Sequence, residues 1–444
     1  MKNFINNYFK IKERNSDIKT EIISGIIIYL TMAYIIFVEP TVLKIAGMDF
    51  GGVLVATCIG SAIICILMGL LANFPIAGAP LMGENFFFVF TIVIAMKFSW
   101  QAALTAVFIE GILFLILTLL KLRQIIIDAI PNSLKHAMAV AIGLFIGFIG
   151  LKWSGIIVPN SSTGIALGNL KSTPVIIAVF GLIITSSFII KKVKATLLYG
   201  ILITTLLCLI FGISKFEGIV SLPPSISSVF MKFDFSFIHN FNFWIIVFLL
   251  LYMEIFDTIG TIIGIAEEAG FVKNNKIENA EKILFVDALG TTVGSLLGTS
   301  TISSYIESNA GVTQGARTGL SVIITGFLFL ISIFFYPLIK MIGGGYEIAP
   351  GNIIYPAVGP ALIIVGFLML KNITKIDFSD FSESLPAYFT ILGVPLTYSI
   401  ADGIAFGIIS YPVIKLLTGE TKKVSIIMYI LAIIFIIRYA FFHI

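Results

Sequence analysis

Residues 299–315, TSTISSYIESNAGVTQG, interrupt a chain that otherwise consists mainly of long apolar segments. The stretch has the position of a membrane span, yet it is short, rich in hydroxyl side chains, carries two glycines and contains Glu307. A span broken at mid-membrane leaves backbone N–H and C=O groups unpaired, which is tolerated only where they face protein or a water-filled cavity. The stretch therefore predicts a polar wall inside a membrane protein.

The composition of the whole chain also indicates a membrane protein. Of the 444 residues, 58% are hydrophobic and 12% are charged, whereas a soluble domain has about 25% charged residues. The first nineteen residues, MKNFINNYFKIKERNSDIK, are polar and basic and lack the features of a cleavable signal peptide. We therefore expect an all-α polytopic protein with a short N-terminal tail.

Crossing the hydrocarbon core takes about 20 mostly apolar residues in a helix. On this criterion we expect fourteen transmembrane segments, at 20–43, 51–71, 80–97, 99–121, 134–152, 173–190, 194–213, 242–268, 282–298, 300–315, 317–342, 352–371, 384–400 and 402–418. A further apolar run, 424–442, is either an additional span or an interfacial helix.

The distribution of Lys and Arg predicts the orientation. With the N-terminus in the cytoplasm, 20 of the 28 basic residues lie on cytoplasmic ends or loops, seven lie outside, and Arg438 is not assigned to either side. Cytoplasmic loops carry the excess of positive charge in membrane proteins. We therefore expect a multi-pass protein of the cell membrane, with the lipid bilayer around it and a cytoplasmic N-terminus.

The third segment resembles the tenth in being interrupted. It begins with NFPIAGAPLMGEN (73–85), which has two prolines and two glycines. The third and tenth segments start about 220 residues apart, as do the first and eighth, and 130–152 aligns with 349–371. Because seven spans is an odd number, the second copy must be inverted. Matching interrupted segments in two inverted halves point to a transporter's binding site.

Two carboxylates occur within the apolar stretch LYMEIFDTIGTIIG (251–264). Glu254 and Asp257 are three residues apart and so share one face of a helix. A charge at the bilayer centre costs at least about 2.5–3.5 kcal/mol, and nearly all basic residues lie at span ends. Asp257 has the alternative of bonding hydroxyls such as that of Thr258. We expect both carboxylates to line a polar cavity, where they can bind and release a proton.

The tenth segment offers a carboxylate among donors and acceptors. Glu307 can accept two ring N–H groups of a planar ligand, a bond that is stronger when the carboxylate is ionised. The alternative is that it only caps a half-helix. In the third segment Glu84, Asn85 and Phe86 occupy a similar place, with the amide available for hydrogen bonds and the phenyl ring for stacking.

Several kinds of chemistry find no support in the sequence. The three cysteines lie in apolar segments without CxxC spacing, and the three histidines lie near span ends, in a loop or at the C-terminus. No nucleotide-binding GxxxxGK[ST] motif and no HExxH motif occurs. We expect no enzyme activity, cofactor, bound metal or nucleic-acid partner.

Three stretches together resemble the nucleobase–cation symporter-2 superfamily, and within it the hypoxanthine–guanine–adenine permeases of the azaguanine branch. They are YMEIFDTIGTIIGIAEEAG, DALGTTVGSLLGTSTISSYIESNAGVTQGARTGL and PLTYSIADGIAFGIISY, and the similarity runs from about Thr20 to Gly419. The resemblance implies two inverted seven-span repeats, a core domain of spans 1–4 and 8–11, and a gate domain of spans 5–7 and 12–14. It also implies a homodimer.

The resemblance further implies roles for individual residues. The family's base-contacting carboxylate falls on Glu254, its functionally required neighbour on Asp257, its tenth-segment carboxylate on Glu307 and its third-segment asparagine on Asn85. This chain departs from the family pattern around that asparagine, where LMGENF (81–86) places Glu84 and Phe86 at positions usually occupied by an apolar and a small residue. Under the inverted repeat, Glu84 lies near the position that mirrors Glu307.

These observations combine into one functional hypothesis, import of hypoxanthine, guanine or adenine by symport with a proton rather than with Na⁺. The predicted substrate contacts are Glu254, Glu307, Asn85, Phe86, Ile306, Ser308 and Glu84, and the predicted proton-coupling residues are Asp257 and Glu254. The alternatives are a transporter of the same fold for a uracil- or xanthine-type base or a small anion, and a non-transport intramembrane subunit or enzyme.

The predicted domain organisation follows the spans. We expect an N-terminal tail (1–19), the first half of the core domain (20–121), the first half of the gate domain (122–213), an extracellular loop (214–241), the second half of the core domain (242–342), the second half of the gate domain (343–418) and a C-terminal apolar segment (419–444).

Overall fold

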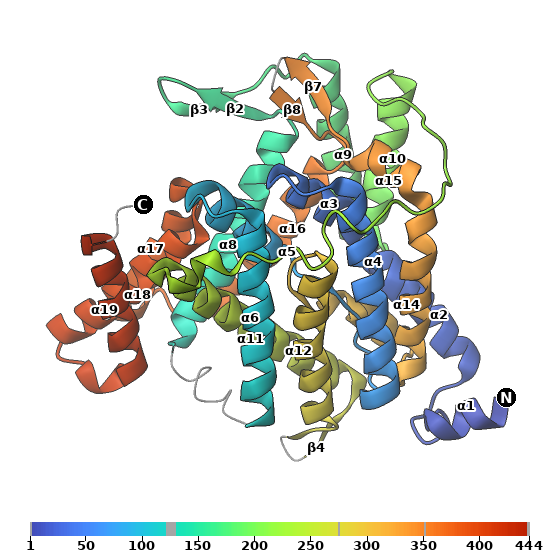
Figure 1. The fold of residues 1–444 in the computed structure, drawn as a ribbon, viewed down its shortest axis with the longest axis horizontal. Helices are drawn as coiled ribbons and strands as arrows, with labels where there is room; N and C mark the ends of the chain where they lie inside the picture. The colour runs from blue at the N-terminus through green and yellow to red at the C-terminus, as the bar shows by residue number, and fades with distance from the viewer. Residues whose placement is uncertain (1, 121–129, 274–275, 350–351, 442–444) are drawn as a thin grey trace.

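The computed structural model describes residues 2–120, 130–273, 276–349 and 352–441. Two predicted boundaries, the division between core and gate domains at 121–122 and the last residue of the run 424–442, lie outside the described residues. In the described part, eight helical segments are long and apolar enough to cross a membrane, and three shorter apolar helices accompany them. The protein is therefore an all-α multi-pass membrane protein (Figure 1).

The α-helices follow the predicted segments closely. They are α1 (Lys2–Tyr8), α2 (Ile18–Met32), α3 (Ile35–Ile45), α4 (Phe50–Leu67), α5 (Met82–Phe86), α6 (Trp100–Leu119), α8 (Asn132–Trp153), α9 (Thr173–Ile190), α10 (Thr196–Ile210), α11 (Phe241–Ala269), α12 (Ala280–Leu297), α13 (Asn309–Val312), α14 (Gly319–Ser332), α15 (Tyr336–Gly343), α16 (Gly359–Met369), α17 (Phe381–Thr397), α18 (Ile400–Leu417) and α19 (Ile426–Phe441). Wider π-helical turns extend α4 (Met68–Ala72) and α5 (Phe87–Ala95).

In the described residues the strands are short and form four antiparallel pairs. They are β1 (Gly78–Pro80) with β6 (Ile302–Ser304), β2 (Ile157–Asn160) with β3 (Gly164–Leu167), β4 (Val272–Lys273) with β5 (Lys276–Ile277), and β7 (Tyr346–Ala349) with β8 (Asn352–Ile354).

The pair β1–β6 explains how the two interrupted segments are accommodated. Ala79 lies opposite Ser303 at the centre of the pair. On either side the pairing continues through backbone bonds, from Leu81 N–H to Thr301 O at 3.0 Å and from Tyr305 N–H to Ala77 O at 2.9 Å. Each broken segment thus supplies the backbone partners that the other lacks, as a membrane interior requires.

The helices pack in two groups. In one, α14 packs on α2 and α4, and α12 packs on α6 and α4 while α11 also contacts α6. In the other, α16 and α17 pack on α8, α17 packs on α18, and α10 packs on α9. Contacts between the groups are sparser, and they include those of α5 with α8 and of α18 with Phe87–Ala95. The two broken segments lie in the first group.

Glycines allow a very close approach of α8 and α16. A Cβ atom at Gly366 would lie 2.4 Å from the Gly143 carbonyl oxygen and 2.8 Å from the Gly147 nitrogen. A Cβ atom at Gly150 would likewise lie 2.8 Å from the Gly359 oxygen. The two backbones therefore touch where small residues permit it, a common solution for helices in membranes.

One predicted span start was wrong, and one predicted span contains an internal break. The segment predicted to be helical from residue 352 begins as β8, and α16 starts only at Gly359. Pro356 disfavours a helical conformation for the residue before it, and Pro360 is placed in the first turn of α16. The segment 20–43 is divided into α2 and α3 at Ala33 and Tyr34. This break brings Tyr34 into the centre of the molecule.

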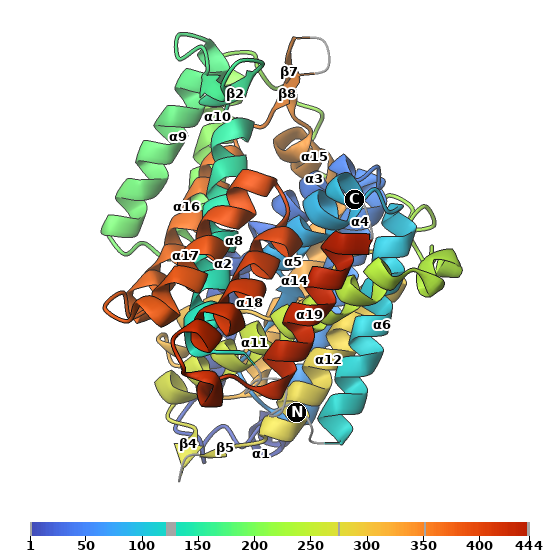
Figure 2. The ribbon, with the colours of Figure 1, turned by 90° about the vertical axis from the view of Figure 1, so that its left-hand side faces the viewer.

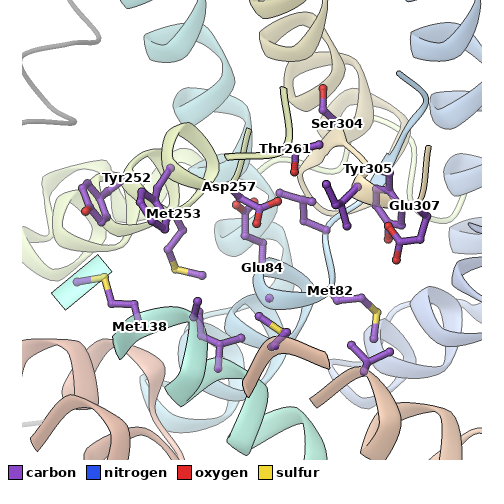
Figure 3. A pocket seen from close by; sticks show the side chains of 18 of the residues that line it. Met82, Glu84, Met138, Tyr252, Met253, Asp257, Thr261, Ser304, Tyr305 and Glu307 are labelled. Carbon is purple, nitrogen blue, oxygen red and sulfur yellow. The ribbon is translucent and has the colours of Figure 1, made fainter. Parts of the chain in front are cut away.

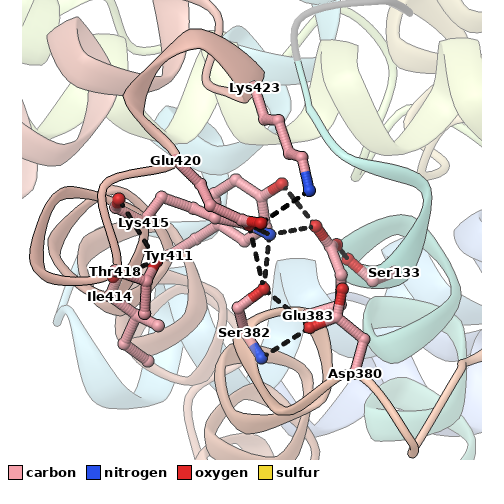
Figure 4. A network of polar contacts seen from close by, with 10 residues as sticks. All are labelled: Ser133, Asp380, Ser382, Glu383, Tyr411, Ile414, Lys415, Thr418, Glu420 and Lys423. Atoms are coloured by element: carbon pink, nitrogen blue, oxygen red, sulfur yellow. Dashed lines mark hydrogen bonds and ion pairs between the residues drawn. The ribbon is translucent and has the colours of Figure 1, made fainter.

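A buried lysine ties together one end of α8, α17 and α18 (Figure 4). The Lys415 ammonium lies 2.8 Å from both Glu383 and Glu420, and its side chain is fully buried. Ser133 on α8 donates a hydrogen bond of 2.5 Å to Glu383. Hydrogen bonds from Lys415 and Lys423 lower the pKa of the half-buried Glu420 carboxyl to about 2. The cluster holds the ends of three helices in register.

The C-terminal helix α19 lies lengthwise against α18 (Figure 2). Near its end, Arg438 pairs with Asp402 at 3.1 Å and the Tyr439 hydroxyl donates to the same carboxylate at 2.6 Å. Asp402 is in the first turn of α18, so the two helices run in opposite directions over a similar length. Of the two predicted alternatives for this segment, such packing favours an additional span.

Candidate functional site

A cavity of about 190 Å³ lies between the two helix groups, beside the broken segments (Figure 3). This volume is far beyond that of a single bound water. Its walls come from the α2–α3 break, the β1–α5 and β6–α13 connections, α8, α11 and α16. The lining residues are Tyr34, Leu81, Met82, Gly83, Glu84, Met138, Ala139, Ile142, Tyr252, Met253, Phe256, Asp257, Thr261, Ser304, Tyr305, Ile306, Glu307, Val365 and Met369.

Acidic side chains form one wall of the cavity. Asp257 on α11 is solvent-exposed although it lies in the middle of a membrane-spanning helix. Glu307 is half-buried and accepts a hydrogen bond of 2.7 Å from the Tyr34 hydroxyl. Glu84 also faces the cavity but is only 2% exposed. No Lys, Arg or His is among these lining residues, so the site favours ligands with hydrogen-bond donors and disfavours anions.

The opposite wall is apolar and flexible. Met138 and Ile142 come from α8, and Val365 and Met369 come from α16. Methionine adapts its shape to the ligand that it contacts. The combination of apolar side chains with a few placed polar groups is typical of small-molecule sites.

Four of the predicted contact residues are not among the residues that line this cavity. The Asn85 amide donates to Glu39 at 2.7 Å, and Phe86 stacks on Phe90 at a ring-centroid distance of 5.6 Å. The Ser308 hydroxyl accepts the Ala77 N–H at 3.0 Å. The fourth, Glu254, is fully buried and accepts a hydrogen bond from Thr291. The structure thus places Glu84, Asp257, Ile306 and Glu307 together at the cavity. The four residues named above pack around the site without lining it.

Two further carboxylates fix the shape of the site and were not identified from the sequence. Asp287 on α12 accepts hydrogen bonds from the Thr258 hydroxyl, the Ser303 hydroxyl and both the N–H and the hydroxyl of Ser304. Glu39 on α3 accepts from the Ser300 hydroxyl at 2.7 Å, besides Asn85.

The signal for these residues was present in the sequence. Each is a single acidic residue in an otherwise apolar segment, the same feature that identified Glu254 and Asp257. Glu110 on α6 has this feature too, and it is fully buried beside Glu254. Tyr34 had no such signal, because a tyrosine in an apolar helix is common.

The fold and the sequence are similar to those of known proteins. A model described as Permease family matches residues 19–406. The chain belongs to the permease family. It is similar to the adenine permease AdeP of Escherichia coli, with 40% identity over 434 residues that cover 98% of this chain and 95% of AdeP. It is also similar to the guanine/hypoxanthine permease PbuG of Bacillus subtilis, with 40% identity and coverage of 98% and 99%.

Solved structures support the same fold. The permease resembles the transmembrane domain of the cyanobacterial bicarbonate transporter BicA, with a TM-score of 0.63, 16% identity, and coverage of 86% of this chain and 96% of that chain. At this identity the likeness concerns the fold alone. The family membership shows that the permease is a transporter and not an enzyme, and its apolar helices make it a multi-pass membrane protein.

Proposed function

We propose that this permease imports a purine nucleobase, namely hypoxanthine, guanine or adenine, together with a proton. The observation that carries the proposal is the accessible acidic wall formed by Asp257 and Glu307, which faces apolar side chains across the cavity. A purine presents ring N–H or amino groups at its edge and flat faces above and below. Carboxylates accept such donors strongly, and the named activities of AdeP and PbuG agree with this chemistry.

We assign the two helix groups to the predicted core and gate domains. In this proposal residues 20–121 and 242–342 form the core and residues 122–213 and 343–418 form the gate, within fourteen spans arranged as two inverted repeats. The cavity has walls from both groups, so movement of one group against the other would open it to alternate sides of the membrane. The cytoplasmic N-terminus and the homodimer remain part of the proposal.

The pair β1–β6 supports the inverted repeat. Counting equal numbers of residues from Ala79 and Ser303 brings Asn85 to the same position as Asn309, and Glu84 to the same position as Ser308. Glu307 corresponds in this way to Gly83. Glu84 and Glu307 are therefore one position apart in the repeat, near each other but not equivalent.

The test is transport by the purified permease in proteoliposomes. We expect an inward proton gradient to drive accumulation of labelled adenine, hypoxanthine or guanine, and a sodium gradient of equal size to drive none. Asp257→Asn and Glu307→Gln should each reduce uptake at least about tenfold. Asp377→Asn, in an exposed loop, is the control and should transport as the wild type does.

The competing functions predict different outcomes in the same assay. Accumulation of uracil, xanthine or bicarbonate without accumulation of these purines would contradict the proposed substrate. The absence of basic side chains among the cavity-lining residues disfavours an anion. Uptake that follows the sodium gradient would retain the purine but refute the proton as the coupled ion.

A further inference from the structure

Three buried carboxyl groups meet behind the acidic wall of the cavity. Glu84 comes from α5, Glu110 from α6 and Glu254 from α11. Their exposed fractions are 2%, 0% and 0%. All three carboxyl groups interact electrostatically: Glu84 with Glu110, and Glu254 with both. Glu84 lines the cavity, whereas the described lining residues do not include Glu110 or Glu254.

The hydrogen bonds of this cluster are incomplete. Thr301 donates to one oxygen of Glu110 at 3.1 Å, and Thr291 donates to one oxygen of Glu254. The second oxygen of Glu110, the second oxygen of Glu254 and both oxygens of Glu84 are buried without a hydrogen-bond partner in the described chain. A buried polar atom of this kind requires an explanation, such as a catalytic or ion-binding role.

The strongest charges acting on this cluster are negative. The Asp287 carboxylate lies close enough to repel negative charge on both Glu84 and Glu254, and the Asp257 carboxylate does the same for Glu84. Within the residues that the structure describes, no Lys, Arg or His forms an ion pair with Glu84, Glu110 or Glu254. The full negative charge of three carboxylates would therefore be uncompensated in a low-dielectric interior, which is prohibitively unfavourable.

Protons supply both the missing donors and the missing compensation. Glu110 and Glu254 are neighbouring carboxyl groups in this buried cluster. Two carboxyl groups side by side in a low-dielectric site are not both ionised, because their like charges repel, and they can share one proton, as in paired-carboxylate enzyme sites. A proton on one carboxyl then donates to the oxygen of the other.

We propose that Glu110 and Glu254 together bind the transported proton and that Glu84 passes it between this pair and the cavity. This inference rests on the proposed proton symport and adds its location. A proton from cavity water protonates Glu84, moves to the shared site of the pair, and leaves by the same route when the cavity faces the cytoplasm. The proton site is then distinct from the cavity wall that contacts the base.

The geometry also provides a link between the two sites. A base that donates N–H groups to Asp257 and Glu307 keeps those carboxylates ionised. Asp257 acts on Glu84 by its charge, so an ionised Asp257 favours a protonated cluster. Bound base and bound proton therefore stabilise each other, and by linkage each raises the affinity for the other.

The test separates proton coupling from substrate movement in proteoliposomes that contain the full chain. We would measure purine-driven proton uptake with an internal pH dye, and exchange of labelled for unlabelled purine without a gradient. For Glu110→Gln we expect exchange within about twofold of wild type, and at least about a tenfold loss of proton uptake and of gradient-driven accumulation. Glu110→Asp, which can still carry a proton, should restore part of the coupling.

The matched control is Glu21→Gln. Glu21 is also fully buried, with one oxygen that accepts from the Ser16 hydroxyl and the Arg317 backbone N–H and a second oxygen without a partner in the described chain, but it is not among the residues that line the cavity. This variant should retain both exchange and coupling. Full proton uptake by Glu110→Gln would overturn the inference. Loss of both readouts in Glu110→Gln and in Glu110→Asp alike, in protein that elutes as a folded species, would also overturn it by assigning Glu110 a structural role. A wild type without purine-driven proton uptake would instead refute the proposed function.

Discussion

The hydrogen bonds of Asp287 predict a large difference between two substitutions at one position. Its carboxylate accepts the Thr258 hydroxyl at 2.6 Å and the Ser303 hydroxyl at 2.9 Å through one oxygen. The other oxygen accepts the Ser304 N–H at 2.7 Å and the Ser304 hydroxyl at 2.6 Å. Asp287 thereby connects α12 to α11 and to β6, which leads directly into the cavity wall.

Asp287→Ala removes all four acceptor contacts. The buried Ser304 N–H is left without this partner, at a cost of about 1–3 kcal/mol. The Thr258 and Ser303 oxygens are 2.7 Å apart, so these hydroxyls can bond each other and lose less. The cavity left by the missing side chain adds to this cost, whereas the variant no longer has to bury a charged group, which reduces it. We therefore expect the free energy of unfolding to fall by about 2–4 kcal/mol.

Asp287→Asn keeps most of the geometry. The amide oxygen can accept from Ser304, and the amide N–H₂ can donate to the Thr258 and Ser303 hydroxyls, which are able to act as acceptors. We expect a change of about 1 kcal/mol or less. Thermal unfolding of the detergent-purified permease, followed by purine binding at fixed pH, distinguishes the two variants.

The expected result is a lower unfolding temperature and weaker purine binding for the Ala variant, with the Asn variant close to wild type. If Asp287→Ala unfolds and binds as the wild type does, these hydrogen bonds do not hold β6 in place. If Asp287→Asn is as damaging as Asp287→Ala, the charge and not the set of acceptors is what matters.

Three other substitutions follow from single contacts. Gly366→Ala places a Cβ atom 2.4 Å from a backbone oxygen of α8 and should cost about 1–3 kcal/mol of stability in thermal unfolding, whereas Gly147→Ala, where the nearest atom is 3.9 Å away, should cost little. Tyr34→Phe removes the hydroxyl donor of Glu307 and should change purine affinity by about three- to tenfold, measured by equilibrium binding. The folded-state pKa of Glu420 is lowered to about 2, so its contribution to stability is complete above its unfolded pKa of about 4.5 and is lost as the pH falls toward 2. In Glu420→Gln the free energy of unfolding should therefore depend less on pH between about 4.5 and 2, as measured by unfolding at a series of pH values.

Much of the architecture could be predicted from the sequence because it depends on composition over long segments. The interrupted third and tenth segments and most helix positions follow from runs of apolar residues and from Gly and Pro. The start of α16 was missed because an apolar run does not distinguish a strand from a helix, and only the prolines at 356 and 360 mark the change. The break at Tyr34 carries no comparable mark.

The orientation of individual side chains was less predictable. Glu254 and Asp257 are three residues apart, which on a helix separates their directions by about 60°. That angle is sufficient for Asp257 to face the cavity while Glu254 faces Glu110 and Thr291. Near Asn85 the short α5 passes into a π-helical turn, so a regular period cannot assign the direction of that side chain.

Hydrogen-bond satisfaction separates two kinds of buried acid in this membrane protein. Glu39 and Asp287 have donors from hydroxyls, an amide and backbone N–H groups, so their oxygens are satisfied and they hold the broken segments in place. Glu84, Glu110 and Glu254 lack such donors on several oxygens, and in them a proton is the partner that fits. An acidic residue in an apolar segment therefore has either a functional or a structural role. The hydrogen-bond donors around its carboxyl group distinguish the two, because a carboxylate with every oxygen satisfied has no need to exchange a proton.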